Sequence, residues 1–144
     1  MLTDVSERCD TIEECYEFML AYAAQGRPGE GGSASGAQIR DFLNRAVKAI
    51  SGLAELGAEA VKEQNLQPAD KYDAFLAVID RDSRDSLAAI ELVLAQASIS
   101  SQLIDNLNAS IHLRALLTDL FLLSDILRLN VIVSADSAAA GGLR

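Results

Sequence analysis

The sequence predicts an all-α protein, an up-down-up-down four-helix bundle. Long segments carry apolar residues at the i, i+3, i+4 spacing of a helix face, and the breaks between them contain Gly, Pro or Asn. No segment alternates apolar and polar residues as a strand would, and no internal repeat is present. The expected helices cover residues 5–25, 36–63, 68–96 and 99–129, all approximate bounds.

Length and charge limit the possible partners. The 144 residues suit one domain, and 50% apolar with 23% charged residues is a globular composition. The net charge of −9 argues against nucleic acid and against anionic membrane surfaces, which both select Lys and Arg. We therefore expect an acidic protein whose partners are other proteins.

The first expected helix follows a capping box, Thr11 to Glu14, or begins one or two turns earlier. Its cysteines, Cys9 and Cys15, lie six residues apart and so point about 120° away from each other, which makes a disulfide between them unfavourable. We expect two buried thiols. The apolar face of this helix, at the i, i+3, i+4 spacing, consists of Ile12, Cys15, Tyr16, Met19 and Ala23. The next segment, residues 26–36, is a Gly/Ser-rich loop without an apolar anchor, and it is expected to be flexible.

The second expected helix follows another capping box, at Ser35, and contains Gly52, which weakens it modestly. Asn65 and Pro68 separate it from the third helix, since Pro is favoured at a helix start. Ser98 or Ser100 caps the last helix.

The protein should be cytoplasmic. Its N-terminus has no basic segment followed by an apolar one, as a secretory signal would have. Arg114, Asp119 and Asp125 interrupt the longest apolar run, so no 18-residue apolar span is present. Residues 1–130 are expected to form the single domain, and residues 131–144 a disordered tail.

The last expected helix is apolar on nearly every side, unlike the other three. A helix of this kind must be covered nearly all round, and three neighbours in a square bundle leave part of it bare. The simplest way to bury the remaining apolar surface is contact with a second protein, most often a second copy of the same chain related by two-fold symmetry. The residues expected at this interface are Leu103, Leu107, Leu116, Leu117, Phe121 and Leu123.

The same helix carries the polar residues that could form a binding site. On a wheel of 100° per residue, Asp105, Asn108 and Asp119 lie within about 40° of His112, the only histidine. Arg114 lies among apolar neighbours. If buried it needs a carboxylate from the first helix, and otherwise its charged end reaches water at an edge.

The segment Ser110 to Thr118 resembles the phosphoacceptor helix of sensor histidine kinases, in which Ser-His-Glu-Leu-Arg is typical. The resemblance implies phosphoryl transfer through His112. Leu113 replaces the acidic residue of that pattern, and the proline expected after the arginine is absent. A histidine that is merely hydrogen-bonded on a helix face is the alternative.

No metal, cofactor or catalytic site is expected. A di-iron bundle needs two Glu-x-x-His pairs, and Cys9, Cys15 and His112 lack the short spacings of a zinc site. No Gly-x-Ser-x-Gly or phosphate-binding glycine motif occurs. The sequence therefore favours a non-enzymatic accessory or adaptor protein that forms a homodimer through its last helix. The alternatives are phosphotransfer through His112, and a carrier or enzyme for a small anionic ligand beside Arg114.

Overall fold

The computed structural model describes the backbone of residues 2–32 and 34–142 and the side chains of residues 4–32 and 34–130. Over these ranges the chain is all-α, with six helices and no strand. The helices are α1 (Leu2–Ala24), α2 (Ala34–Ile50), α3 (Leu53–Glu63), α4 (Ala69–Leu94), α5 (Ser101–Ala109) and α6 (His112–Gly142).

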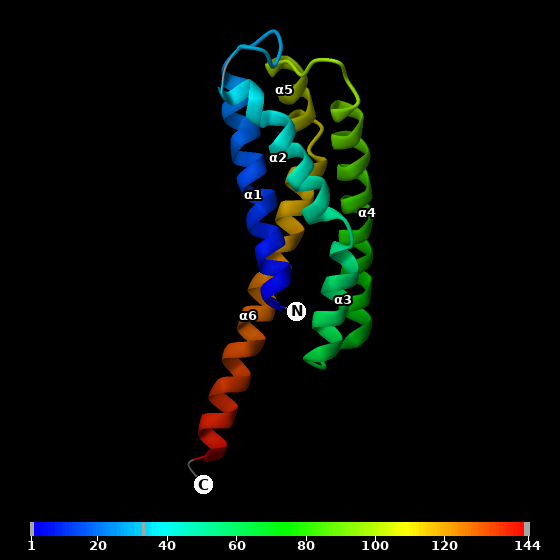
Figure 1. Cartoon of the computed structure of the whole chain (residues 1–144). Coiled ribbons are helices and arrows are strands. Elements are labelled where there is room, and N and C mark those ends of the chain that lie inside the picture. Colours follow the sequence, from blue (N-terminus) through cyan, green and yellow to red (C-terminus); the bar gives the residue numbers. More distant parts are fainter. Residues whose placement is uncertain (1, 33, 143–144) are drawn as a thin grey trace.

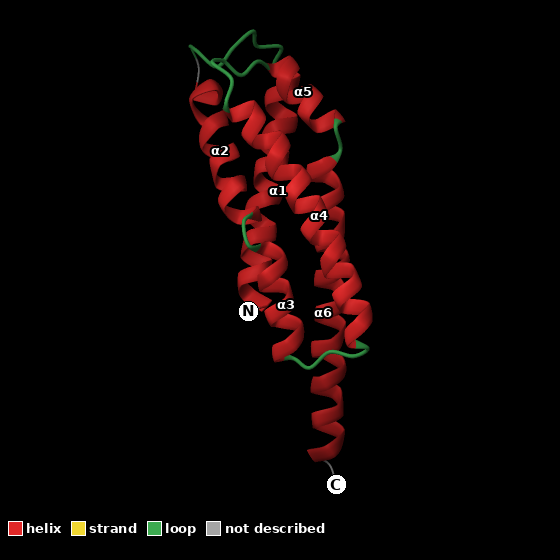
Figure 2. Cartoon of the chain, turned by 90° about the vertical axis from the view of Figure 1, so that its right-hand side faces the viewer, coloured by secondary structure: helices red, strands yellow, loops and turns green. Residues whose placement is uncertain are grey.

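The helices form an elongated bundle in which the chain reverses direction three times (Figure 1). α1 leads to the upper end, α2 and α3 return along it, α4 leads up again, and α5 and α6 descend. α1 and α4 each pack against α2, α3, α5 and α6. The two broken helices therefore lie between α1 and α4, and α6 extends beyond the lower end of the bundle (Figure 2).

The expected helix over residues 36–63 is in fact two helices, so that prediction of four continuous helices was wrong. Gly52 adopts a left-handed backbone conformation, with φ of 73°, and separates α2 from α3. Glycine alone adopts this conformation without steric cost. The guanidinium of Arg8 on α1 donates to the carbonyl oxygens of Ala49 and Ser51, which have no helical partner once α2 ends.

The expected helix over residues 99–129 is also broken, at Ser110 and Ile111 between α5 and α6. The hydroxyl of Ser110 donates to the carbonyl oxygen of Leu107 at 2.6 Å, and Ile111 has a φ of 62°. A β-branched residue rarely takes a positive φ, so the sequence pattern gives no sign of this break. Beyond it α6 continues past residue 130 to Gly142. The side chains after Asn130 lie outside the described residues, so a tail from residue 131 remains a prediction.

The helix caps were predicted with mixed success. The Ser100 hydroxyl accepts a hydrogen bond from the Leu103 N–H, which confirms Ser100 as the N-cap of α5. Thr11 is not a cap, because α1 begins at Leu2 and the Thr11 hydroxyl donates to the Glu7 carbonyl one turn back. Ser35 lies inside α2, and its hydroxyl accepts from the Gln25 side chain instead of capping the helix.

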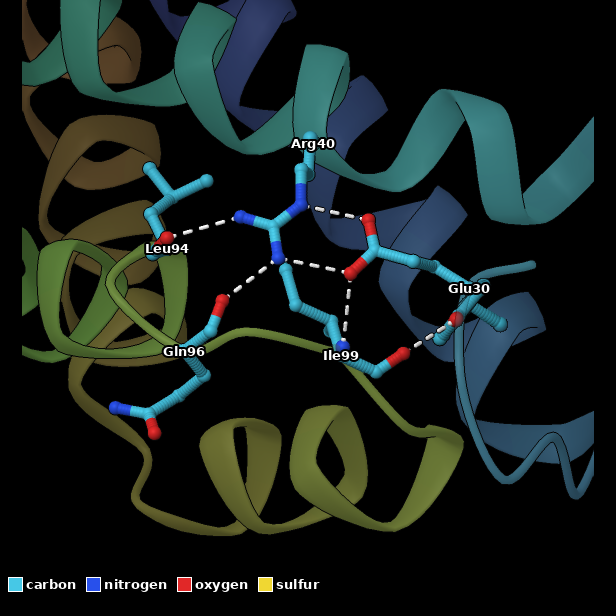
Figure 3. A network of polar contacts seen from close by, with 6 residues as sticks. Glu30, Arg40, Leu94, Gln96 and Ile99 are labelled. Atoms are coloured by element: carbon cyan, nitrogen blue, oxygen red, sulfur yellow. Dashed lines mark hydrogen bonds and ion pairs between the residues drawn. The ribbon is translucent and has the colours of Figure 1, made fainter.

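A polar network closes the upper end of the bundle (Figure 3). Arg40 on α2 forms a two-pronged ion pair with Glu30, at 2.6 and 2.8 Å, and donates to the carbonyl oxygens of Leu94 and Gln96 where α4 ends. Glu30 also accepts the N–H of Ile99, and the hydrogen bond from Arg40 lowers the pKa of Glu30. Residue range 26–36 therefore contains a polar anchor that its composition does not reveal.

Close packing around Glu30 explains one glycine of this segment. A Cβ atom on Gly36 would lie 1.8 Å from the Glu30 carbonyl oxygen. Only glycine permits this approach of the loop to the first turn of α2.

The core lies along the bundle axis and contains the residues expected from the apolar spacing. Ile12, Cys15 and Met19 of α1 are fully buried, and both cysteines are free thiols. Burial raises the pKa of Cys9 to about 11 and of Cys15 to about 12, so both remain protonated and unreactive at neutral pH. Among the described helices none is long and apolar enough to span a membrane.

Candidate interaction surface

The side of α6 that faces away from the bundle is unusually apolar. From Ile111 to Leu129, residues spaced alternately four and three positions apart in the sequence lie on this side. On a helical wheel they fall within about 40° of one line parallel to the helix axis. Large side chains on it are Leu122 and Leu129 of α6, which are 51% and 60% exposed. Ile111, 57% exposed, directly precedes α6 and continues the same line, since its carbonyl oxygen accepts the Ala115 N–H and its side chain lines a hollow with Ala115 and Thr118. We call this line the outer stripe; it consists of Ile111, Ala115, Thr118, Leu122, Asp125 and Leu129.

The outer stripe is extended on one flank by Phe121, which is 43% exposed. From Ile111 to Leu129 it runs roughly 27 Å at the helical rise of 1.5 Å per residue. Elsewhere in the described chain the exposed large apolar side chains are isolated, namely Leu20 on α1 and Leu92 on α4.

Most residues predicted at the interface lie inside the bundle. Leu107, Leu116, Leu117 and Leu123 are buried, and Leu103 is half-buried against the core. Only Phe121 is exposed. A helical wheel drawn from the sequence treats residues 99–129 as one helix and so ignores the break at Ile111. It also gives no information about which apolar side α1 and α4 cover.

The break also separates the polar residues predicted to cluster around His112. His112 is the exposed first residue of α6, whereas Asp105 and Asn108 belong to α5. Asp105 is exposed. Asn108 is half-buried, and its two amide atoms are enclosed without a hydrogen-bond partner in the described part of the chain. No hydrogen bond or ion pair joins these residues to one another in the described part of the chain, so a shared site around His112 stays a prediction.

Arg114 is exposed, as expected for an arginine whose charged end reaches water. It lines a surface hollow of about 440 Å³ together with Ile111, Ala115, Thr118 and Asp119. Four of the lining residues occupy positions i, i+3, i+4 and i+7 along the chain: Ile111, Arg114, Ala115 and Thr118. This is the arrangement that forms a hole for a side chain of a facing helix.

Asp119 lies where α6 packs against α4. Desolvation by burial, followed by the hydrogen bond and the charge of Asp82 on α4, raises the pKa of Asp119 to about 7. Its Oδ2 atom is buried without a hydrogen-bond partner among the described groups. Two carboxylates this close favour a shared proton over two negative charges. In the described ranges no three His, Cys, Asp or Glu residues gather as a metal site would require.

An apolar groove of about 310 Å³ adjoins the lower part of the outer stripe, between α4 and α6. Tyr72 and Phe75 of α4 form one wall, and Leu122 and Ile126 of α6 form the other. Leu122 therefore belongs both to the stripe and to the groove, which widens the apolar surface towards α4.

Comparison with known protein families, curated proteins and solved structures finds no match for this chain.

The residues that sequence reasoning missed are Ile111, Leu122 and Leu129. Their spacing along one line was visible in the sequence. Thr118 and Asp125 on the same line favour its exposure, since the buried sides of α6 carry leucine at the corresponding turns, but they do not show where α1 and α4 pack.

Proposed function

We propose that the protein is a non-enzymatic accessory or adaptor protein that acts by protein–protein contact and forms a homodimer through the outer stripe of α6. The observation that carries this proposal is the exposure of Ile111, Leu122 and Leu129 on a single line. Exposed apolar residues that are scattered singly are normal, whereas contiguous ones mark an interaction surface.

A second copy of the chain suits this surface because the stripe is symmetric about residue 120. Ile111 and Leu129 lie equally far from that point, and so do Thr118 and Leu122. Two-fold contacts use the same patch on both copies, so a patch must complement itself when it is reversed.

Multi-angle light scattering over a concentration series tests the proposal. The wild-type chain should approach twice its monomer mass at tens of micromolar, whereas Leu129→Asp should remain monomeric because it places a charge in the apolar contact. Leu92→Asp is the matched control, since Leu92 is 66% exposed on α4 and away from the stripe. A strict monomer at high micromolar concentration would overturn the homodimer.

Phosphotransfer through His112 is a second candidate, favoured by the exposure of that side chain. Incubation with phosphorylated response regulators should then give acid-labile phosphate on the wild type and none on His112→Ala. No labelling across the regulators of the host would end this candidate.

A third candidate, binding of a small anion, is favoured by the hollow beside Arg114. Inorganic phosphate or citrate should raise the melting temperature of the wild type and not that of Arg114→Ala. Asp119 in the same hollow opposes an anion when it is ionised, so binding should weaken as the pH rises through about 7. No stabilisation at any pH would exclude this candidate.

A further inference from the structure

We infer that two α6 helices pair antiparallel about residue 120, and that Asp125 of each copy enters the hollow beside Arg114 of the other. This inference rests on the proposed homodimer and adds its geometry. Three properties of the outer stripe support it: the order of its layers, the shape of the hollow and the position of its charges.

The symmetry of the stripe fixes which residue of one copy lies opposite which residue of the other, and each such facing pair forms one layer of the contact. Reversal about residue 120 places Ile111 opposite Leu129 of the second copy and Thr118 opposite Leu122. The remaining layer places Ala115 opposite Asp125. Every large apolar residue of the stripe is thereby covered, and the smallest residue faces the charged one.

The hollow has the form that this layer requires. Ile111, Arg114, Ala115 and Thr118 surround it, and the side chain facing Ala115 would enter between them. An aspartate in this position meets a guanidinium at the edge of the hole, so its charge is not left unpaired. This accounts for a charged residue on a line whose other members, apart from Thr118, are apolar.

The charges distinguish the two directions of pairing. In a parallel pair Arg114 would lie beside Arg114 and Asp125 beside Asp125, and both contacts are repulsive. In the antiparallel pair each arginine meets an aspartate. The present partner of Asp125 is Arg128 at 3.9 Å, with both side chains about 70% exposed, and such a surface pair is easily replaced.

Asp119 also lines the hollow and must be accommodated. It faces Asp82 on α4, and its pKa, raised to about 7, keeps it largely protonated in mildly acidic solution and about half protonated near pH 7. A protonated carboxyl group does not repel the incoming Asp125.

Charge reversal tests the ion pairs. Arg114→Glu and Asp125→Lys should each raise the dimer Kd roughly tenfold, and the double variant should recover most of the loss, since reversed charges again meet their opposites. Arg84→Glu and Asp73→Lys are matched controls, because they change the net charge equally at exposed positions of α4. Additive losses in the double variant would overturn the reciprocal contact.

Crosslinking tests the direction. In an antiparallel pair two Ala115→Cys residues lie roughly 15 Å apart along the axis, beyond the reach of a short bismaleimide. A mixture of Ala115→Cys and Asp125→Cys chains should therefore crosslink, whereas each variant alone should not. The buried native thiols should leave the wild type uncrosslinked.

The outcomes separate the two proposals. A dimer that crosslinks through Ala115→Cys alone is parallel, and it overturns this inference while the homodimer stands. A chain that shows no dimer by light scattering overturns both.

Discussion

α4 and α6 are the two longest helices and pack against each other, yet their outer sides differ. α4 presents to solvent a charged surface on which Leu92 is the single large apolar residue. α6 presents Leu122 and Leu129 in line with Ile111, the residue that directly precedes it. The outer side of α4 is suited to water, whereas that of α6 is suited to another protein surface. The exposed charged residues of α4 are Asp70, Lys71, Asp73, Arg81, Arg84, Asp85 and Glu91.

The inner sides differ in the opposite sense. The core-facing line of α4 includes Ser83 and Ser86, both buried, and neither hydroxyl has a hydrogen-bond partner in the described structure. The core-facing positions of α6 are leucines. α4 thus places polar groups inside and charges outside, whereas α6 is apolar on both sides. Stability and association can therefore be altered separately on α6.

The largest expected effect is on the inner side of α6. Leu120→Ala should lower the free energy of unfolding by about 3 kcal/mol, because Leu120 is 1% exposed and its truncation leaves a cavity. Leu129→Ala should change the unfolding of the monomer by less than about 0.5 kcal/mol. Urea denaturation at a concentration below the dimer Kd measures both. Equal losses would mean that the two sides of α6 are not distinct.

Ser86 is the strongest test of the inner side of α4. Ser86→Ala removes a buried hydroxyl without a partner, so it should stabilise the fold by roughly 1 kcal/mol. Ser83→Ala should act in the same direction. A loss of stability in denaturant melts would show that these hydroxyls are hydrogen-bonded in solution.

Asp119 gives a pH dependence to the contact between the two helices. Its pKa is raised from 3.8 to about 7 on folding, so the folded state binds the proton more tightly. The stabilisation is complete below the unfolded pKa and is lost as the pH rises towards 7. Asp119→Asn should melt like the wild type near pH 4 and higher than it at pH 8. Asp85→Asn, at an exposed position of α4, should show no such divergence.

The smallest expected effect is at the break between α5 and α6. Ile111→Gly relieves the positive φ but also makes the unfolded chain more flexible, so stability should rise by no more than about 1 kcal/mol. The same change removes one end of the outer stripe and should weaken the dimer. A calorimetric melt and light scattering on one sample separate the two effects.

Sequence reasoning succeeded where the determinants are local. The apolar spacing placed the α1 core at Ile12, Cys15 and Met19, and Ser100 was one of the two serines expected as a cap. It failed at Ile111, because nothing in a β-branched residue announces a left-handed backbone.

Contacts between residues far apart in the chain could not be predicted from the sequence pattern either. Arg40 reaches carbonyl groups 54 and 56 residues away, and the anchoring of Glu30 depends on that reach. For the proposed interaction surface, the sequence pointed to the last helix but to residues that the bundle mostly buries. Which apolar side of α6 is covered depends on how α1 and α4 pack against it, and that is decided only by the complete bundle.

Methyl NMR spectra recorded on dilution test the central claim most directly. If the outer stripe is the contact, the methyl signals of Leu122 and Leu129 should shift as the concentration falls through the dimer Kd, whereas those of Leu92 and Leu20 should not move. These four leucines are similarly exposed, so they differ chiefly in their place on the fold. Stationary signals for Leu122 and Leu129 in a chain that dimerises, or a shift at Leu92 instead, would contradict the assignment of α6 as the contact surface.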